Sequence, residues 1–312
     1  MKIFVTGVAG QLGNDILKVL DRRGDIAVGS DIVETCENIP TSASYVALDI
    51  TDADQVRNTL LEHKPDAIIH CAAWTAVDAA EDEENREKVY AINAGGTENI
   101  AVVAGEIGAK MLYISTDYVF DGEGTKPWDP DDKNYNPLCV YGDSKLKGEL
   151  AVAENVEKFF VTRISWVFGA NGNNFVKTML NVGERFDTLK VVDDQIGLPT
   201  YTPDLSELLV DMIKSDKYGY YHVSNEGDYI SWYDFAKEIF KVACEMGHSN
   251  YSPERLTVNA VSTEEYGVSK AKRPFNSRLD KSKLVKNGFK LLPDWKDALR
   301  RYMEEYYGTD NC

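Results

Sequence analysis

The sequence has no long uninterrupted apolar run, which bears on where the protein works. The apolar residues near the N-terminus, 3–5, stop before Gly7, whereas the apolar core of a signal peptide runs for about 7–15 residues. A membrane-spanning helix needs about 20 such residues, and no later stretch approaches that length. We therefore expect a cytoplasmic protein with no membrane partner.

Cysteine is scarce and shows no pairing pattern. The chain has five scattered cysteines and no CxxC pair: Cys36, Cys71, Cys139, Cys244 and Cys312. An odd number at irregular spacing argues against a disulfide framework and against a zinc site. The pattern favours a reducing compartment.

Basic residues are few relative to acidic ones. Lys and Arg number 34 against 51 Asp and Glu, a formal net charge of -17. This excess repels a nucleic-acid backbone at long range, so we expect no nucleic-acid partner. It does not exclude a phosphorylated small molecule, because a single site can gather local donors. With 43% hydrophobic and 27% charged residues, the composition suits a globular protein with a sizeable core.

What the first half of the sequence does contain is an alternation of short β-rich runs and helical patterns. The expected strands are 3–6, 26–29, 45–48, 67–70, 110–115 and 159–164. The helical stretches between them are 11–22, 52–63, 83–107 and 141–155. Each interval is long enough for a right-handed crossover, which predicts an α/β fold with a doubly wound parallel Rossmann-type sheet.

After about residue 165 this rhythm breaks. We expect helices at 174–186, 203–215 and 232–246, and strands at 188–192 and 220–224. We assign residues 1–165 to a dinucleotide-binding domain, to which later elements from about 188–224 return. Residues 166–312 are expected to form mainly a smaller C-terminal substrate-binding lobe, packed against the C-terminal edge of the sheet.

Three glycines lie between the first expected strand and the first expected helix. Gly7, Gly10 and Gly13 form a GxxGxxG motif, with Gln11 and Leu12 inside it at the start of the helix. Glycines there allow a tight turn and let backbone N–H groups approach a pyrophosphate at the helix N-terminus. The motif therefore predicts a nicotinamide dinucleotide site, and its spacing resembles that of the extended short-chain dehydrogenases.

A carboxylate at the end of the second strand bears on the choice of coenzyme. Asp31 lies 18 residues past Gly13, where it can accept hydrogen bonds from ribose hydroxyls and would repel a 2′-phosphate. No Lys or Arg lies between Arg23 and Arg57 to bind such a phosphate, so the residues lean towards NADH over NADPH. Further residues expected to line the cofactor end the third and fourth strands: Asp49, Ile50, Cys71, Ala72 and Ala73.

A tyrosine and a lysine four residues apart are candidates for proton transfer. Tyr141 and Lys145 project from one face of an expected helix. The nearby ammonium should lower the pKa of the phenol from about 10, and Lys145 can also hold the nicotinamide ribose. Thr116, within Ser115–Asp117, ends the fifth strand at the crevice where such sheets bind ligands, and it can orient a substrate oxygen. Together with the glycines, these residues predict a hydride-transferring enzyme.

In these segments and in later ones the chain resembles the dTDP-4-dehydrorhamnose reductase family of the extended short-chain dehydrogenases. The resemblance covers essentially the whole chain. It rests on GVAGQLG (7–13), CAAWTAVD (71–78), YISTDYVF (113–120), YGDSK (141–145), RISWVF (163–168), GNNF (172–175), VDDQIGLPT (192–200) and RPFNSRL (273–279). The later segments discriminate best, because GxxGxxG and YxxxK occur in many relatives.

The resemblance implies reduction of the C4 carbonyl of dTDP-4-dehydro-L-rhamnose to dTDP-L-rhamnose by NADPH or NADH. It implies that the catalytic residues are Thr116, Tyr141 and Lys145. It places Asp117 and Trp166 at the sugar, and it places Asn174, Gln195 and Arg278 at the nucleotide diphosphate. In some members of the family Mg²⁺ bridges a dimer through carboxylates. The resemblance leaves Mg²⁺ open as a cofactor, but we cannot map its ligands onto this chain and assign no metal ligand. A monomer and a homodimer both stay open.

One departure and two alternatives accompany the resemblance. Trp74 stands on the cofactor side where the family pattern has His or Tyr. The first alternative is a nucleotide-sugar dehydratase or epimerase, but Tyr118 replaces the Glu that a dehydratase has after Thr-Asp. The second is a non-catalytic regulatory subunit like the methionine adenosyltransferase β subunit, against which the TAVD segment and the pair Ser165–Trp166 count.

Overall fold

Seven parallel strands form the central sheet of the computed structural model, which describes residues 1–309 and so leaves Cys312 outside the described residues. Their spatial order is β11-β6-β5-β4-β1-β2-β3. The strands are β1 (Lys2–Thr6), β2 (Ile26–Asp31), β3 (Ser44–Ala47), β4 (Ala67–His70), β5 (Lys110–Thr116), β6 (Phe159–Ile164) and β11 (Gly219–Val223). The predicted doubly wound parallel sheet is therefore confirmed.

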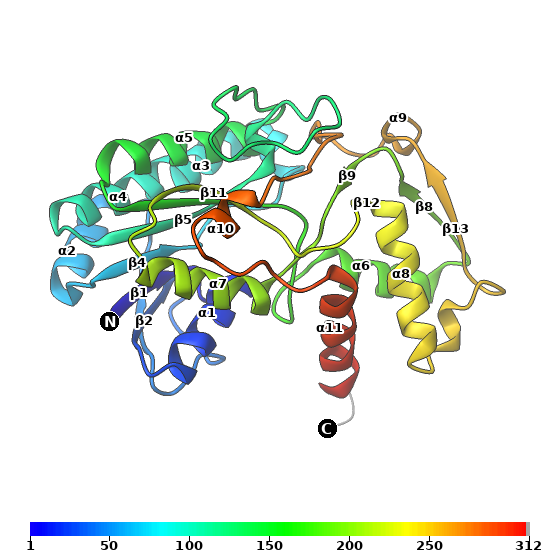
Figure 1. Cartoon of the computed structure of the whole chain (residues 1–312), viewed down its shortest axis with the longest axis horizontal. Helices are drawn as coiled ribbons and strands as arrows, with labels where there is room; N and C mark the ends of the chain where they lie inside the picture. Colours follow the sequence, from blue (N-terminus) through cyan, green and yellow to red (C-terminus); the bar gives the residue numbers. More distant parts are fainter. Residues whose placement is uncertain (310–312) are drawn as a thin grey trace.

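Helices cover both faces of this sheet (Figure 1). One face carries α1 (Gln11–Arg22) and α7 (Thr202–Lys214), and the other carries α2 (Ala53–His63), α4 (Thr97–Glu106) and α5 (Val140–Asn155). Because side chains alternate along a strand, Ile3 and Val5 join the core under α1 and α7, whereas Phe4 joins the core under α2 and α4. The layers thus leave the carboxyl ends of the strands facing the C-terminal lobe.

The single helix expected at 83–107 is divided into three parts. These are α3 (Glu83–Tyr90), a π-helical segment (Ala91–Gly96) and α4. Short π-helical stretches are rare and occur often at functional sites. Here the segment brings Asn93 against the chain that follows β4, as described below.

The lobe has its own aromatic core, which includes Phe168, Phe235, Trp295 and Tyr302. Its helices are α6 (Phe175–Arg185), α8 (Trp232–Glu245), α9 (Thr263–Tyr266) and α11 (Trp295–Thr309), and α10 (Ser282–Lys286) lies near β11. Its strands pair two by two: β7 (Val167–Phe168) with β10 (Thr200–Tyr201), β9 (Ile196–Gly197) with β12 (Ile230–Ser231), and β8 (Thr188–Val192) with β13 (Thr257–Val261). Of the segment 188–224, α7 and β11 lie with the central sheet, whereas β8 lies in the lobe.

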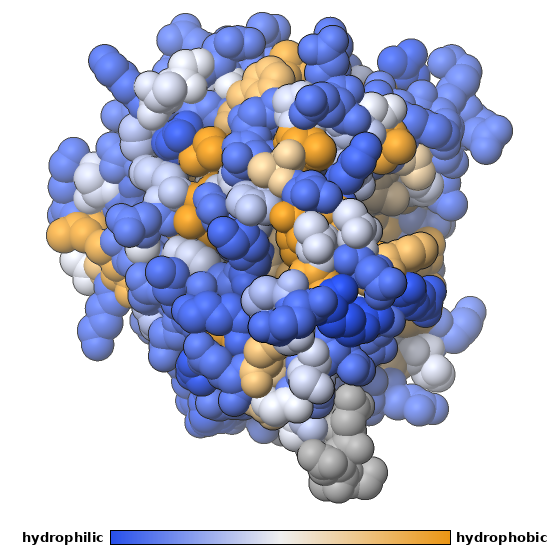
Figure 2. All heavy atoms as spheres, turned by 90° about the vertical axis from the view of Figure 1, so that its right-hand side faces the viewer, coloured by the Kyte–Doolittle hydropathy of each residue, from blue (hydrophilic) through white to orange (hydrophobic). Residues whose placement is uncertain are grey.

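The outer face of the lobe is mainly hydrophilic, with apolar residues interspersed (Figure 2). Across residues 1–309, none of the helices has the length and apolar character that crossing a membrane requires.

Candidate active site

The glycine motif forms a tight backbone cradle between β1 and α1. Gly7 has a positive φ of 72°, and a Cβ at this position would lie 2.7 Å from the backbone nitrogen of Ala72. A Cβ at Gly13 would collide with the carbonyl oxygen of Gly7. No side chain caps α1, whose N-cap is Gly10 and whose first turn holds no acidic residue. Its first N–H groups are therefore suited to bind an anion.

The rest of the predicted motif lies on the same turn. Leu12 is buried in the core beneath α1, whereas Gln11 turns towards the lobe. The Gln11 side-chain amide donates to the carbonyl of Asn173 (3.2 Å) and accepts from Asn174 (3.1 Å). The cradle and the lobe are thus joined directly at this point.

The carboxylate of Asp31 is fixed at the edge of the cradle. One oxygen accepts from the backbone N–H of Ala9 at 3.0 Å, and the other accepts from the N–H of Ile32 at 2.8 Å. Two backbone donors orient the acid where β2 ends. The structure therefore places Asp31 beside the glycine turn, as the sequence predicted.

Two of the residues expected to line the cofactor, Asp49 and Ile50, follow β3, and Ile50 packs against the π-helical segment. Asp49 accepts from the N–H and the hydroxyl of Thr51, at 2.9 and 2.7 Å. Ile50 is buried, and a Cβ added at Gly96 would lie 2.7 Å from its side chain. Gly96 therefore leaves the space that Ile50 fills.

A buried hydrogen-bond network that sequence reasoning missed fixes the end of β4. The hydroxyl of Thr6 accepts from the N–H groups of Cys71 and Ala72, both at 3.1 Å, and pairs with His70 Nδ1 at 2.7 Å. His70 Nε2 lies 3.1 Å from the hydroxyl of Thr97. Burial, with a smaller contribution from Lys145, lowers the pKa of His70 to about 3, so this imidazole is neutral. In the sequence, the one sign of this network is that a histidine, His70, ends an otherwise apolar strand.

Thr116, Tyr141 and Lys145 are brought together as predicted. Thr116 ends β5, and its hydroxyl lies close enough to the Tyr141 side chain to influence the pKa of that phenol. Tyr141 and Lys145 lie on α5, and the Lys145 ammonium sits 4.0 Å from the centre of the Tyr113 ring. Lys145 is buried and Tyr141 is half-buried. Thr116 and Tyr141 thus lie close together at the carboxyl end of the sheet, and Lys145 lies one turn further along α5.

Burial dominates the acidity of this cluster. It raises the pKa of Tyr141 above its ordinary value, although the neighbouring Thr116 hydroxyl opposes the rise. Burial also lowers the pKa of Lys145 to about 7, against the opposing effects of Glu149 and Cys71. The sequence predicted that Lys145 lowers the pKa of Tyr141, and the net direction is the reverse because spacing does not show depth of burial. In the protein alone, Tyr141 holds its proton.

Asp117 adds an unpaired acceptor next to Thr116. One oxygen accepts from the Thr116 hydroxyl at 3.1 Å, and Ser277 lies near the carboxyl. The second oxygen, Oδ2, is buried without a hydrogen-bond partner. Burial raises the pKa of Asp117 to about 6, although Ser277 and Thr116 oppose the rise. A buried acceptor without a donor is costly, so this atom is suited to bind a donor on a ligand.

Trp74 packs beside the predicted proton donor. It belongs to a small cluster that includes Val140 and Tyr141. The side chain of Asn93 pairs with its backbone, accepting from Trp74 N at 2.8 Å and donating to Trp74 O at 3.1 Å. Asn93 also donates to the Ser144 hydroxyl at 2.9 Å. Asn93 was not a candidate from the sequence. Its role in holding Trp74 becomes visible only in the structure, where the π-helical segment places it against the chain after β4.

Trp166 projects from a strained turn after β6. Its φ of 49° lies in the left-handed region, which is rare for a bulky residue and often marks a functional position. Its ring stacks on Trp232 with centroids 3.8 Å apart and planes 17° apart, and Phe175 lies 4.5 Å from Trp232. The lobe therefore offers a rigid aromatic surface.

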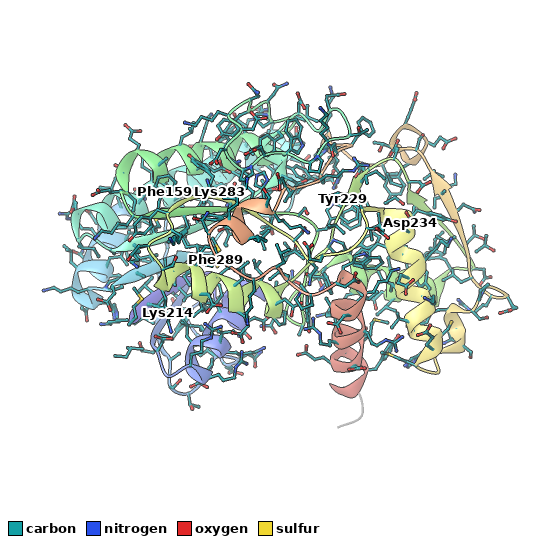
Figure 3. All side chains as sticks on the ribbon, in the orientation of Figure 1. Phe159, Lys214, Tyr229, Asp234, Lys283 and Phe289 are labelled. Carbon is teal, nitrogen blue, oxygen red and sulfur yellow. The ribbon has the colours of Figure 1, made fainter. Side chains whose placement is uncertain are left out.

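The three residues expected at the diphosphate have separate partners. Asn174 caps α6 by accepting from Lys177 N at 3.0 Å, in addition to its bond with Gln11. Gln195 donates to the hydroxyl of Thr263 at 3.0 Å. The Arg278 guanidinium lies 5.6 Å from the ring of Tyr229, which is located between the central sheet and α8 (Figure 3).

Among the residues that the structure describes, no three His, Cys, Asp or Glu side chains gather closely enough to hold a metal ion.

The cradle at α1, the parallel sheet and a Tyr–Lys pair facing a strand-end threonine place the chain in the class of extended short-chain dehydrogenases. Residues 1–308 match the family described as the RmlD substrate binding domain. The chain belongs to this family.

Similar proteins cover nearly the full length of the chain. The dTDP-4-dehydrorhamnose reductase of Escherichia coli K12 is 37% identical, with 99% of each chain covered. The spore coat polysaccharide biosynthesis protein SpsK of Bacillus subtilis is also 37% identical, with 97% of each covered.

Solved structures agree with this assignment. The dTDP-4-dehydrorhamnose reductase of Clostridium acetobutylicum is 38% identical with a TM-score of 0.87, covering 98% of this chain and 100% of the other. The Bacillus anthracis enzyme, in complex with NADP, is 39% identical with a TM-score of 0.84, covering 97% and 99%. A Thermus thermophilus UDP-glucose 4-epimerase has a TM-score of 0.82 at 18% identity, covering 99% of each chain, which is a likeness of fold alone.

Proposed function

We propose that the protein reduces the C4 carbonyl of dTDP-4-dehydro-L-rhamnose to the alcohol of dTDP-L-rhamnose with a nicotinamide coenzyme. The observation that carries this proposal is the Thr116–Tyr141–Lys145 cluster beside a glycine cradle. Its support comes from a family whose relatives are named dTDP-4-dehydrorhamnose reductases. The product would serve as an activated sugar for polysaccharide synthesis.

The residues at β1 and α1 fit a dinucleotide. The Gly7–Gly13 turn has no room for side chains, and the N–H groups that open α1 lack a side-chain cap. We assign cofactor contacts to this turn, to Asp31 and to the ends of β3 and β4. The bound coenzyme supplies the hydride.

Tyr141 then acts as the general acid. As the carbonyl carbon is reduced, its oxygen becomes an alkoxide, and the Tyr141 hydroxyl donates its proton to that oxygen. Thr116 shares the hydrogen bonding of the same oxygen. The buried Lys145, with a pKa near 7, stabilises the phenolate that remains. The raised pKa of Tyr141 keeps its hydroxyl protonated in the protein without substrate, so that the proton is available for transfer to the alkoxide.

The sugar and the diphosphate are assigned to the remaining polar and aromatic groups. The unpaired Oδ2 of Asp117 accepts a hydrogen bond from a sugar hydroxyl. Trp166, which stacks on Trp232, forms one wall of the sugar site. Arg278 offsets the diphosphate charge in an otherwise acidic chain. Asn174 and Gln195 are assigned to the same diphosphate.

NADH and NADPH both stay open as the coenzyme, although the residues at the cradle favour NADH. The Asp31 carboxylate, fixed by two backbone donors, suits ribose hydroxyls and repels a 2′-phosphate. A relative binds NADP, so both coenzymes belong in the test.

The decisive experiment is a coupled assay that supplies dTDP-4-dehydro-L-rhamnose with NADH or NADPH in parallel. We expect turnover by the wild type, none by Tyr141→Phe, and unchanged coenzyme binding in that variant. Normal turnover by Tyr141→Phe would refute the proton-donor assignment. Absence of turnover by the wild type, with binding to a synthetase partner instead, would favour a regulatory role.

A further inference from the structure

Residues 270–279, here called the crossing segment, return the chain from the lobe to the nucleotide-binding domain. From residue 264, within α9, to residue 270 the chain is exposed, and it then runs over to α10 beside the central sheet (Figure 1). It first meets the nucleotide-binding domain at Asp78, in the loop after β4. Asp78 and the first residue that it binds, Lys270, are 192 residues apart in the sequence.

Asp78 holds the start of the crossing segment with four hydrogen bonds. It accepts from the backbone N–H groups of Lys270 and Ala271, at 3.0 and 3.1 Å. Arg273 donates to both of its oxygens, Nη1 at 3.0 Å and Nη2 at 2.6 Å. This bidentate pair is the main reason that the pKa of Asp78 is lowered. Such charge-assisted forks are strong and specific in direction.

The later part of the crossing segment reaches the proposed substrate site. Ser277 lies close enough to the carboxyl of Asp117 to oppose the rise in its pKa, and the Ser277 N–H donates to Ile196 O in the lobe at 2.8 Å. Asn276 N donates to Gly122 O at 2.9 Å. Arg278 follows directly. One short segment therefore connects the Asp78 clamp, the lobe and the residue beside Thr116.

The clamp also lies close to the proton donor. Arg273 is near enough to Tyr118 and Cys139 for their charges to affect its pKa. Tyr118 in turn packs edge-on against Tyr141, with ring centroids 5.6 Å apart. The ion pair thus sits at the edge of the reaction cluster without touching the hydroxyl that donates the proton.

We propose that Asp78 and Arg273 are positioning residues that hold the crossing segment across the cleft and thereby set substrate affinity. Neither side chain transfers a proton or meets the coenzyme; both act through Ser277 and Arg278. This inference rests on the proposed function, because the substrate is the one assigned above. It predicts that loss of the clamp weakens substrate binding and leaves coenzyme binding intact.

The test compares Asp78→Asn, Arg273→Gln and the double variant with Asp82→Asn as a matched control. Asp82 holds the same segment through the exposed Lys270 ammonium at 2.7 Å, and an exposed pair contributes little. We expect each clamp variant to raise KM for the dTDP-sugar about tenfold, with kcat within about threefold and coenzyme Kd within about twofold. The double variant should be no worse than either single variant, since both remove the same contact. Equal KM in all variants would overturn the proposal, as would a parallel loss of kcat, coenzyme affinity and Tm.

A second measurement does not depend on the substrate. Trypsin can cut after Lys270 and Lys272, which are exposed residues at the clamped end. We expect cleavage there to be at least about tenfold faster in Asp78→Asn than in the wild type or Asp82→Asn, because the local opening equilibrium sets this rate. Unchanged cleavage would refute the clamp itself. A wild type that fails to turn over the dTDP-sugar while the clamp variants are cleaved faster would refute the proposed function and not the clamp.

Discussion

The ion pair between Arg163 and Glu149 is a perturbation whose size the structure defines well, because neither side chain has exposed surface. Arg163 Nε donates to Glu149 Oε1 at 2.9 Å, and Nη2 donates to Oε2 at 2.7 Å. Arg163 also donates to Pro130 O at 3.2 Å and to the Tyr135 hydroxyl at 2.9 Å. The pair joins α5, β6 and the loop before α5. Removing the guanidinium would leave a carboxylate buried without its counter-charge.

We expect Arg163→Met to lower the free energy of unfolding by about 3–5 kcal/mol, the range for breaking a buried pair by removing one partner. Adding Glu149→Leu removes the unpaired carboxylate, so the double variant should regain part of that loss. Arg57→Met is the matched control. It breaks the exposed Arg57–Glu106 pair, with atoms 2.7 Å apart, and should cost only about 0–1 kcal/mol.

Urea unfolding followed by circular dichroism measures all of these variants under one condition. The reasoning is refuted if Arg163→Met costs no more than Arg57→Met. It is refuted equally if the double variant loses the sum of both single losses, because the two side chains would then act independently.

Three further predictions concern the cofactor cradle and the acids beside it. Gly13→Ala should weaken coenzyme binding by at least about tenfold in a titration, because the added Cβ would collide with the Gly7 carbonyl. Gly308→Ala is the control and should leave coenzyme binding unchanged, because no atom lies within 4 Å of a Cβ there. Asp31→Ala should raise affinity for NADPH relative to NADH, and an unchanged ratio of the two Kd values would contradict its role. Burial raises the pKa of Asp117 to about 6, so the folded protein binds this proton more tightly than the unfolded chain does. Stability should therefore fall as the pH rises from about 4 to about 6, and urea melts of Asp117→Asn should lack that part of the decline.

The parts of the site that short-range pattern determines could be predicted from the sequence. The GxxGxxG spacing and the strand–helix alternation depend on neighbours within one turn or one crossover. The same holds for Tyr141 and Lys145, because residues four apart on a helix share a face. Thr116 was predictable because the carboxyl ends of parallel strands form the crevice.

Contacts between distant segments could not be predicted in this way. Asp78 and Arg273 are 195 residues apart, and nothing local to either residue indicates its partner. The sequence predicted a lowered pKa for Tyr141, whereas burial raises it. This burial depends on the packing of all the segments around Tyr141, which the local sequence does not show. Trp166 was predicted as a substrate contact, but its left-handed backbone was not, since no residue pattern specifies it.

The chain after β4 has a further property that follows from Asn93. Oδ1 of this side chain accepts from Trp74 N while Nδ2 donates to Trp74 O, which is the pair of bonds that a neighbouring strand would exchange with that residue. A single amide thus substitutes for a strand at the point where the sheet ends. The segment from Cys71 to Trp74 can therefore pair its backbone at Trp74 with no additional strand alongside it.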